Sequence, residues 1–239
     1  MSFSNISFIL NKPQLSENIG ACARAIKNFN FKKLILINPK PVFPNDKIIA
    51  TSVGAKDVIK NSKVFKNLES SINNFDYLIA TTSRFRNKNI KHIKLNELNR
   101  IDFRKKVAFL FGSEASGLSN NEISYANCVM QIPTNPNFKS LNLSHSVIII
   151  AQVVSSIIKS KNSKYSKSKK IKFASKNDIQ LMTNFCINML ENKNFFKPKE
   201  KKPIMLENLR NIFYKMELSE KEIRILSSVF ANLAKKKVD

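Results

Sequence analysis

Short apolar runs alternate with helix-like segments over the first two thirds of the chain. The runs have the length and the β-branched content of buried strands, and the segments between them have helical spacing of apolar residues. The predicted strands are 6–10, 33–37, 76–80 and 107–111, and the predicted helices are 17–29, 46–53, 67–73 and 119–126. Strands that alternate with helices predict an α/β fold with a largely parallel sheet.

Residues 143–158 form the most apolar predicted helix. One face carries apolar residues at helical spacing, and further apolar residues lie on the other sides: Leu143, Val147, Ile150, Val154 and Ile157 on the first face, and Ile148, Ile149, Val153 and Ile158 elsewhere. A helix that is apolar nearly all round is normally buried. We therefore expect it in the core or against a second subunit.

The sequence changes character after residue 158. Residues 159–176 contain eight lysines and neither Asp nor Glu, which predicts a solvated linker that either contacts a phosphate backbone or is an inert spacer. Three amphipathic helices follow, and a capping box at Ser219–Glu222 starts the last. Their apolar stripes are Ile179, Met182, Cys186 and Met189; Leu206, Leu209, Phe213 and Met216; and Ile223, Leu226, Phe230 and Leu233. The expected organisation is 1–158 as an α/β domain, 159–176 as a linker and 177–239 as a small helical domain.

Composition points to a polyanionic partner. The net charge is +24 and the isoelectric point is about 10.1, with +12 on residues 1–158 and +12 on the much shorter 159–239. Three isolated cysteines and two histidines argue against a zinc site and a disulfide framework. The N-terminus lacks the basic region of a secretory signal, and the run 147–151 is far shorter than a membrane span. We expect a cytoplasmic protein that binds nucleic acid, with no membrane and no metal.

The glycines mark a candidate ligand site. Only four occur in 239 residues, and two of them, Gly112 and Gly117, share one loop. This loop follows the predicted strand 107–111 and precedes a capping box at Ser119–Glu122, which starts a helix. A glycine loop between a strand and a helix is a place where α/β proteins bind ligands.

Two other segments carry candidate chemistry. In Asn18–Ala25 the apolar stripe leaves Arg24 on another face, and Arg24 is one of only seven arginines. Its guanidinium is suited to gripping a phosphate, or it is an ordinary surface arginine. The second segment joins Ile132–Pro136 to Ser140–Ser144 at the start of the apolar helix. Here Ser140 and Asn142 offer polar groups to a ligand, or they only cap that helix.

Together, in this order and spacing, these three segments resemble the SpoU branch of the SPOUT RNA methyltransferases. The resemblance covers residues 1–158. In the tail, 195–196, 209–213 and 223–226 are similar to a subgroup that methylates the 2'-hydroxyl of cytidine or uridine at nucleotide 32 of tRNA. The resemblance implies a deep trefoil knot at the C-terminal side of the α/β domain, S-adenosylmethionine as cofactor, tRNA as substrate and a homodimer.

The resemblance also implies residue roles. Arg24 would clamp a phosphate and stabilise the developing alkoxide, since a guanidinium with a pKa above ~12 is a poor base. Asn18 and Glu114 would hold Arg24 or the ribose in place, and Asn142 would orient the hydroxyl. No metal is needed, because the leaving group departs neutral. The cofactor loops would be formed by Thr81, Thr82, Ser83, Gly112, Ile132, Lys139, Ser140 and Leu141.

Two features concern RNA recognition. Arg84 and Arg86 flank an aromatic residue, an arrangement suited to phosphate contact with base stacking, although a chance pair on an exposed loop would look the same. Many relatives carry arginine or proline directly after the glycine at position 112 and a basic or polar residue after the glutamate at position 114, where this chain has Ser113 and Ala115. One guanidinium near the target is therefore absent, and Lys139 is a candidate to replace it.

Three other functions compete with this interpretation. A SpoU-type enzyme could act on ribosomal RNA or on another tRNA site, although the helical tail favours the subgroup above. The chain could also be a basic RNA-binding protein without catalysis. The presence of Asn18, Arg24, Glu114 and Asn142 argues against this alternative, because such a protein would not need them. A dinucleotide-binding oxidoreductase is excluded, because the chain lacks the GxGxxG motif.

Overall fold

The computed structural model describes residues 3–84, 90–161 and 172–234. Seven strands form one sheet, in which all paired neighbours run parallel in the order β3-β2-β1-β6-β4-β7-β5. The strands are β1 (Ile6–Asn11), β2 (Lys33–Ile37), β3 (Lys63–Phe65), β4 (Tyr77–Thr81), β5 (His92–Lys94), β6 (Val107–Phe111) and β7 (Cys128–Gln131). The predicted parallel α/β fold is confirmed, and the four predicted strands agree with β1, β2, β4 and β6 to within one residue at each end.

Three strands and one helix escaped the sequence prediction. β3 and β5 are three-residue strands at the two edges of the sheet, and β7 has four residues. Such short segments carry too few positions to show a period of two, and lysine occurs in both edge strands. The helix α3 (Lys56–Lys60) is equally short. These elements become visible only through their pairing and packing.

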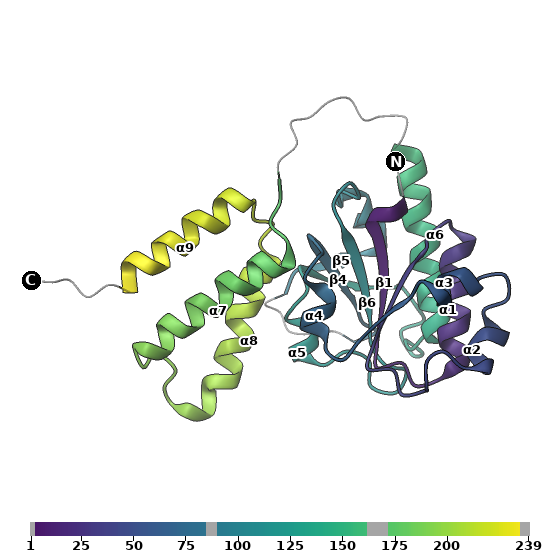
Figure 1. Cartoon of the computed structure of the whole chain (residues 1–239), viewed down its shortest axis with the longest axis horizontal. Coiled ribbons are helices and arrows are strands. Elements are labelled where there is room, and N and C mark those ends of the chain that lie inside the picture. The colour runs from purple at the N-terminus through teal and green to yellow at the C-terminus, as the bar shows by residue number, and fades with distance from the viewer. Residues whose placement is uncertain (1–2, 85–89, 162–171, 235–239) are drawn as a thin grey trace, which may run out of the picture.

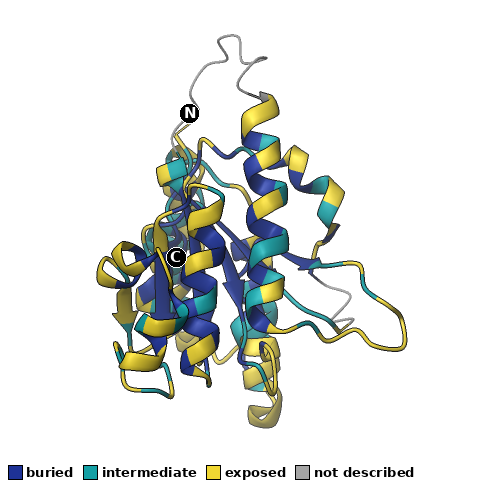
Figure 2. Ribbon diagram, turned by 90° about the vertical axis from the view of Figure 1, so that its right-hand side faces the viewer, coloured by how far each residue is buried: buried dark blue, intermediate teal, exposed yellow. Residues whose placement is uncertain are grey.

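Helices cover both faces of the sheet (Figure 1). On one face α1 (Ser16–Asn28), α2 (Asp46–Thr51), α3 and α6 (Leu143–Lys161) pack on Phe8 and Phe109. The other face, with Leu78 and Val129, is covered by α4 (Leu68–Ile72) and α5 (Asn120–Ile123). The buried cluster on this side continues into α7 (Lys176–Asn192), α8 (Lys202–Lys215) and α9 (Glu220–Ala234), which extend away from the sheet. Figure 2 shows the buried residues gathered in the strands and along the inner sides of the helices. Three short 3₁₀ segments complete the described chain: Phe3–Asn5, Leu95–Arg100 and Lys199–Lys201.

The most apolar helix, α6, is a core helix on one side only. Val147, Ile150 and Val154 are fully buried, whereas Ile149, Val153 and Ile157 along one flank are only partly buried. By length and mean hydropathy its stretch Leu143–Ser160 could also cross a membrane, a property that the short run 147–151 did not predict. In the fold this stretch packs against α1 and the sheet. The prediction of a buried helix is therefore confirmed for one face.

The three C-terminal helices complete the second core. Ile179 of α7, Phe213 of α8 and Ile223 of α9 belong to the same buried cluster as Leu78 and Val129 of the sheet. The predicted stripes are therefore inward faces for most of their length, although Met216 and Leu233 are exposed. The capping box at Ser219–Glu222 is present, since the serine hydroxyl and amide both bond the glutamate.

The described ends of the predicted linker 159–176 are folded. α6 continues to Lys161, and at the other end Ala174 and Lys176 are buried while Phe173 pairs with Ser219. The solvated character expected from the lysines therefore does not extend to 174–176. Residues 162–171 lie outside the described residues.

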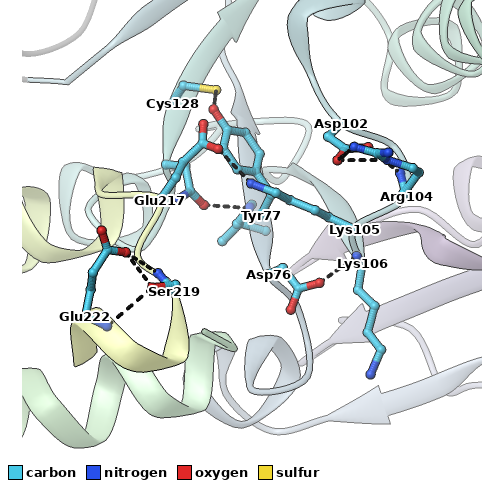
Figure 3. A network of polar contacts seen from close by, with 12 residues as sticks. Asp76, Tyr77, Asp102, Arg104, Lys105, Lys106, Cys128, Glu217, Ser219 and Glu222 are labelled. Carbon is cyan, nitrogen blue, oxygen red and sulfur yellow. Dashed lines mark hydrogen bonds and ion pairs between the residues drawn. The ribbon is translucent and has the colours of Figure 1, made fainter. Parts of the chain in front are cut away.

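A polar network joins the helical part to the sheet (Figure 3). Lys105, which is 8% exposed, forms an ion pair of 2.7 Å with Glu217 in the connection between α8 and α9. Its ammonium lies 3.3 Å from the ring centre of Phe173 and 5.8 Å from that of Tyr77. The Tyr77 hydroxyl in turn contacts Cys128 on β7 at 3.7 Å. Because Lys105 is enclosed, loss of Glu217 would leave its charge buried without a partner, so this contact ties the connection between α8 and α9 to the sheet.

Lys176, at the first turn of α7, is completely buried. Its ammonium donates a hydrogen bond of 3.1 Å to the carbonyl of Tyr214, in the last turn of α8, where helix carbonyls lack partners within the helix. Burial lowers the pKa of Lys176 to about 7, against the opposing effect of Cys128, Glu217 and Asp76 nearby, while Lys105 lowers it further.

This buried lysine predicts a pH-dependent contribution to stability. Its pKa is about 7 in the folded protein and 10.5 ordinarily, so between these values the unfolded chain binds more protons than the folded one. The free energy of unfolding of the wild type, relative to Lys176→Met, should therefore rise from about pH 7 towards pH 10, by at most about 1.4 kcal/mol per pH unit. Urea unfolding at pH 7, 8 and 9 measures this. An exposed-lysine control, Lys172→Met, should show no such trend, and a pH-independent difference for Lys176→Met would contradict the prediction.

Candidate functional site

A pocket opens at the carboxyl ends of three neighbouring strands, β6, β4 and β7. The space between its walls, together with the open solvent at its mouth, measures about 770 Å³. The loops that follow these strands and the first turn of α6 line it: Thr81, Thr82, Ser83, Arg84, Phe111, Gly112, Ser113, Glu114, Ala115, Ser116, Gly117, Ile132, Lys139, Ser140, Leu141, Leu143 and Ser146. The crevice beyond the carboxyl ends of parallel strands is where α/β folds bind ligands.

The glycine loop is closed on itself. The amide of Gly117 donates to the carbonyl of Ser113 at 2.9 Å, and the hydroxyls of Ser113 and Ser116 lie 2.8 Å apart. Gly117 has φ of +67°, in the left-handed region. A Cβ on Gly112 would lie 2.2 Å from the carbonyl carbon of Gly117 and 2.3 Å from the amide nitrogen of Leu118. Gly112 is therefore required for close backbone approach, and Gly117 for the turn.

Hydrogen bonds to neighbouring strands fix the loop after β4. The Thr81 hydroxyl donates to the Leu110 carbonyl at 3.0 Å, and the amide of Thr82 donates to the carbonyl of Met130 at 3.0 Å. The side-chain amide of Gln131 donates to the Ser83 carbonyl at 2.9 Å. Threonine and serine side chains thus line a wall whose backbone is held by the sheet itself, a rigid arrangement for orienting a small ligand.

A chain of side-chain hydrogen bonds runs from the glycine loop to α6. The Glu114 carboxylate accepts from the amides of Gln14 (2.9 Å) and Leu15 (3.3 Å) and from the side-chain amide of Asn18 (2.8 Å). The Asn18 oxygen then accepts from the side-chain amide of Asn142 at 3.1 Å. The oxygen of Asn142 also caps α6, since it accepts from the amide of Ser144 at 2.8 Å. Asn142 therefore caps α6 and also connects this helix to Asn18 beside the pocket.

Arg24 takes no part in this series of hydrogen bonds. It is exposed on α1 and is not among the residues that line the pocket. Within the described part of the chain, no hydrogen bond or ion pair joins it to Asn18 or Glu114. In a single copy of the chain the Glu114 carboxylate is instead engaged by the segment that precedes α1 and by Asn18. That Asn18 and Glu114 hold Arg24 or the ribose in place stays a prediction.

The eight expected cofactor residues all line the pocket, and so do Arg84 and Glu114. Asn18 and Asn142 adjoin it through the hydrogen bonds above, and Arg86 lies outside the described residues. Sequence reasoning missed the first turn of α6, where Leu143 and Ser146 face the pocket. The signal was available, since residues at i and i+3 share a helix face, but the apolar pattern of this helix hid it.

Other reactive groups offer little chemistry. Cys22 lies near Glu114 but is completely buried, and burial, with the carboxylate adding to it, raises the pKa of its thiol far above the ordinary value. Over residues 3–84, 90–161 and 172–234, no group of three His, Cys, Asp or Glu side chains is arranged to hold a metal ion. The pocket instead offers backbone groups, hydroxyls, one carboxylate and the cationic side chains of Arg84 and Lys139, which suits ligand binding and positioning.

The chain resembles known proteins over nearly its full length. The model of the SpoU rRNA Methylase family matches residues 5–152. The tRNA (cytidine-2'-O-)-methyltransferase TrmJ of Methanocaldococcus jannaschii is 28% identical over 237 residues, covering 94% of this chain and 98% of that protein. The tRNA (cytidine/uridine-2'-O-)-methyltransferase TrmJ of Photorhabdus laumondii is 27% identical over 236 residues, 97% of each chain.

Structural similarity extends into the helical part. The crystal structure of TrmJ from Z. mobilis ZM4 superimposes with a TM-score of 0.84 at 29% identity, covering 96% of this chain and 99% of that chain. This likeness supports the SpoU-type fold with a C-terminal helical part, while the trefoil knot that the resemblance implies stays a prediction. Since the family model spans more than half of the sequence, the chain belongs to the SpoU rRNA Methylase family.

Proposed function

We propose that this protein is a cytoplasmic, S-adenosylmethionine-dependent enzyme that methylates a ribose 2'-hydroxyl of tRNA, on cytidine or uridine at nucleotide 32 of the anticodon loop. The observation that carries the proposal is the pocket at the ends of β6, β4 and β7, formed by the expected loops. TrmJ relatives covered from end to end, including the helical part, favour tRNA over ribosomal RNA as the substrate.

The pocket suits the proposed cofactor. Its walls combine apolar side chains such as Phe111, Ile132 and Leu141 with hydroxyls and loop backbone, which matches a ligand that joins an adenine, a ribose and an amino-acid group. Thr81, Thr82 and Ser83 would hold it from one side, and Lys139, Ser140 and Leu141 from the other. When bound, S-adenosylmethionine supplies an electrophilic methyl group on a positively charged sulfur.

The chain's own residues then position the acceptor. Asn142, anchored by Asn18, would hold the ribose hydroxyl in line with the methyl group, and alignment of this kind is a large part of the rate enhancement in group transfer. Glu114 would keep the loop before α1 in place as support. Arg24 would bind a phosphate and stabilise the alkoxide that develops as the proton leaves.

The position of Arg24 supports a homodimer as the active form. Arg24 lies outside the pocket of its own chain, and the apolar flank of α6 with Ile149, Val153 and Ile157 is only partly buried. A second copy packed on this flank would cover the flank and would allow Arg24 of one copy to serve the pocket of the other. The oligomeric state then becomes part of the catalytic mechanism.

The test is incubation of the purified protein with S-adenosylmethionine and unmodified tRNA, followed by nucleoside mass spectrometry. We expect 2'-O-methylcytidine or 2'-O-methyluridine that maps to nucleotide 32. Methylation of ribosomal RNA with none on tRNA would favour the alternative substrate. No cofactor binding and no methylation of either RNA would refute the enzymatic proposal and leave a non-catalytic RNA-binding role.

A further inference from the structure

The loop between β7 and α6 exposes an aromatic ring to solvent. Phe138 is 76% exposed, the highest value for any phenylalanine in the described ranges, and Phe195 follows at 50%. A ring of this size normally buries most of its surface in a folded protein. Its position makes Phe138 a candidate contact for a ligand.

The loop holds Phe138 in a defined position. Its amide donates to the carbonyl of Asn135 at 2.9 Å, and the amide of Asn137 donates to the Asn135 side chain at 2.9 Å. Pro136 lies within the same turn, and the Thr134 hydroxyl reaches the carbonyl of Lys139 at 3.3 Å. An aromatic ring on a braced loop loses little conformational entropy when a partner stacks on it.

The same loop forms the rim of the pocket. Ile132 lines the pocket before the turn, and Lys139, Ser140 and Leu141 line it immediately after Phe138. The ring therefore stands one residue from the wall of the proposed cofactor site. Any nucleotide whose ribose enters the pocket must have its base, or that of a neighbouring nucleotide, close to this rim.

Charge along the loop favours a polyanion over a second copy of this basic chain, and the exposed ring favours RNA, which has bases to stack, over an acidic protein surface. From residue 123 to residue 177 the sequence contains no Asp or Glu, whereas Lys139 is exposed next to the ring. An unstacked base of a single-stranded loop has a free π-face, and base–aromatic stacking contributes about 1–3 kcal/mol per base.

We infer that Phe138 stacks on a base of the RNA substrate next to the methylated ribose, so that it positions the nucleotide for the pocket. This inference rests on the proposed function. It assigns Phe138 to substrate binding, while cofactor binding stays with the pocket walls.

The absence of tryptophan from the sequence makes a direct test possible. Phe138→Trp introduces a single indole at the rim, and an anticodon stem-loop RNA should quench its fluorescence when a base stacks on it. The matched control is Val64→Trp on the edge strand β3, which is 51% exposed and separated from β6 by two strands. The control should keep its emission when the same RNA is added.

Kinetics give the second readout. Phe138→Ala should lower kcat/KM for tRNA by about 5- to 150-fold, the loss of one stacked base, with the affinity for S-adenosylmethionine unchanged. Phe138→Trp, which keeps an aromatic face for stacking, should lose less activity than Phe138→Ala.

The outcomes separate the two proposals. If the wild type methylates tRNA while the indole emission of Phe138→Trp does not respond to RNA, the stacking inference is wrong and the proposed function stands. Emission that is already blue-shifted without RNA, and that changes with protein concentration, would overturn the inference in favour of burial by a second copy. If the wild type methylates no RNA but quenching occurs, stacking stands and the proposed reaction fails.

Discussion

Gly112→Ala is expected to abolish measurable binding of S-adenosylmethionine. A Cβ at this position would lie 2.2 Å from the carbonyl carbon of Gly117, 2.6 Å from its oxygen and 2.3 Å from the amide nitrogen of Leu118. All three atoms belong to the backbone, so no side-chain rotation can relieve the overlap, and the loop must open. Because this loop forms one wall of the pocket, we expect a loss of at least about 100-fold in affinity, close to 3 kcal/mol. Isothermal titration calorimetry measures it.

Gly117→Ala, in the same loop, is the matched control. Gly117 has φ of +67°, and nothing lies within 4 Å of a Cβ built on it. The alanine there costs about 1–2 kcal/mol of backbone strain without overlap. We expect a lower melting temperature for Gly117→Ala with cofactor binding largely retained. Wild-type affinity in Gly112→Ala would show that the loop is not part of the cofactor site.

Arg24→Ala is expected to slow methyl transfer strongly while it leaves cofactor affinity nearly intact. Arg24 is exposed on α1 and lies outside the pocket, so its removal disturbs no described packing or ion pair there. If its guanidinium stabilises the alkoxide in the transition state, loss of that one donor should cost about 100- to 1,000-fold in kcat. Single-turnover methylation of tRNA, with cofactor affinity measured in parallel, separates the two effects.

Arg24→Lys tests what kind of group is needed. Lysine keeps the charge but not the planar fork that grips a phosphate, so activity should recover only in small part. Full activity of Arg24→Ala would show that Arg24 has no role in the reaction. A large loss of cofactor affinity would show that Arg24 belongs to the cofactor site. If the dimer hypothesis holds, mixing Arg24→Ala with Gly112→Ala should restore some activity, because one mixed pocket keeps both groups.

Much of the α/β part could be predicted from sequence because its signals are local. β1, β2, β4 and β6 are buried on both faces and read as continuous apolar runs, and α1 carries a clear apolar stripe. β3 and β5 could not be found in this way, since three residues give no periodicity and their pairing partners are distant in sequence.

In the candidate site, too, the local features could be predicted and the contacts between distant residues could not. The loops after β4, β6 and β7 could be assigned because motif residues sit next to recognisable strands. The engagement of Glu114 with Gln14 and Leu15 could not, because it joins residues about 100 positions apart through backbone amides that carry no sequence signature. The burial of Lys176 was hidden in a lysine-rich stretch where composition argued for solvent.

The shared second core has a consequence for how the chain matures on the ribosome. Ile179, Phe213 and Ile223 belong to the same buried cluster as Leu78 and Val129, and Ile223 lies near the end of the described chain. α4 and α5 cover the sheet early, but the outer side of the cluster, where Tyr125 packs edge-on against Tyr214 at 5.4 Å, is completed only when the C-terminal helices have been made. The α/β part therefore emerges with part of its apolar surface exposed and stays vulnerable to aggregation until almost all of the polypeptide has been synthesised.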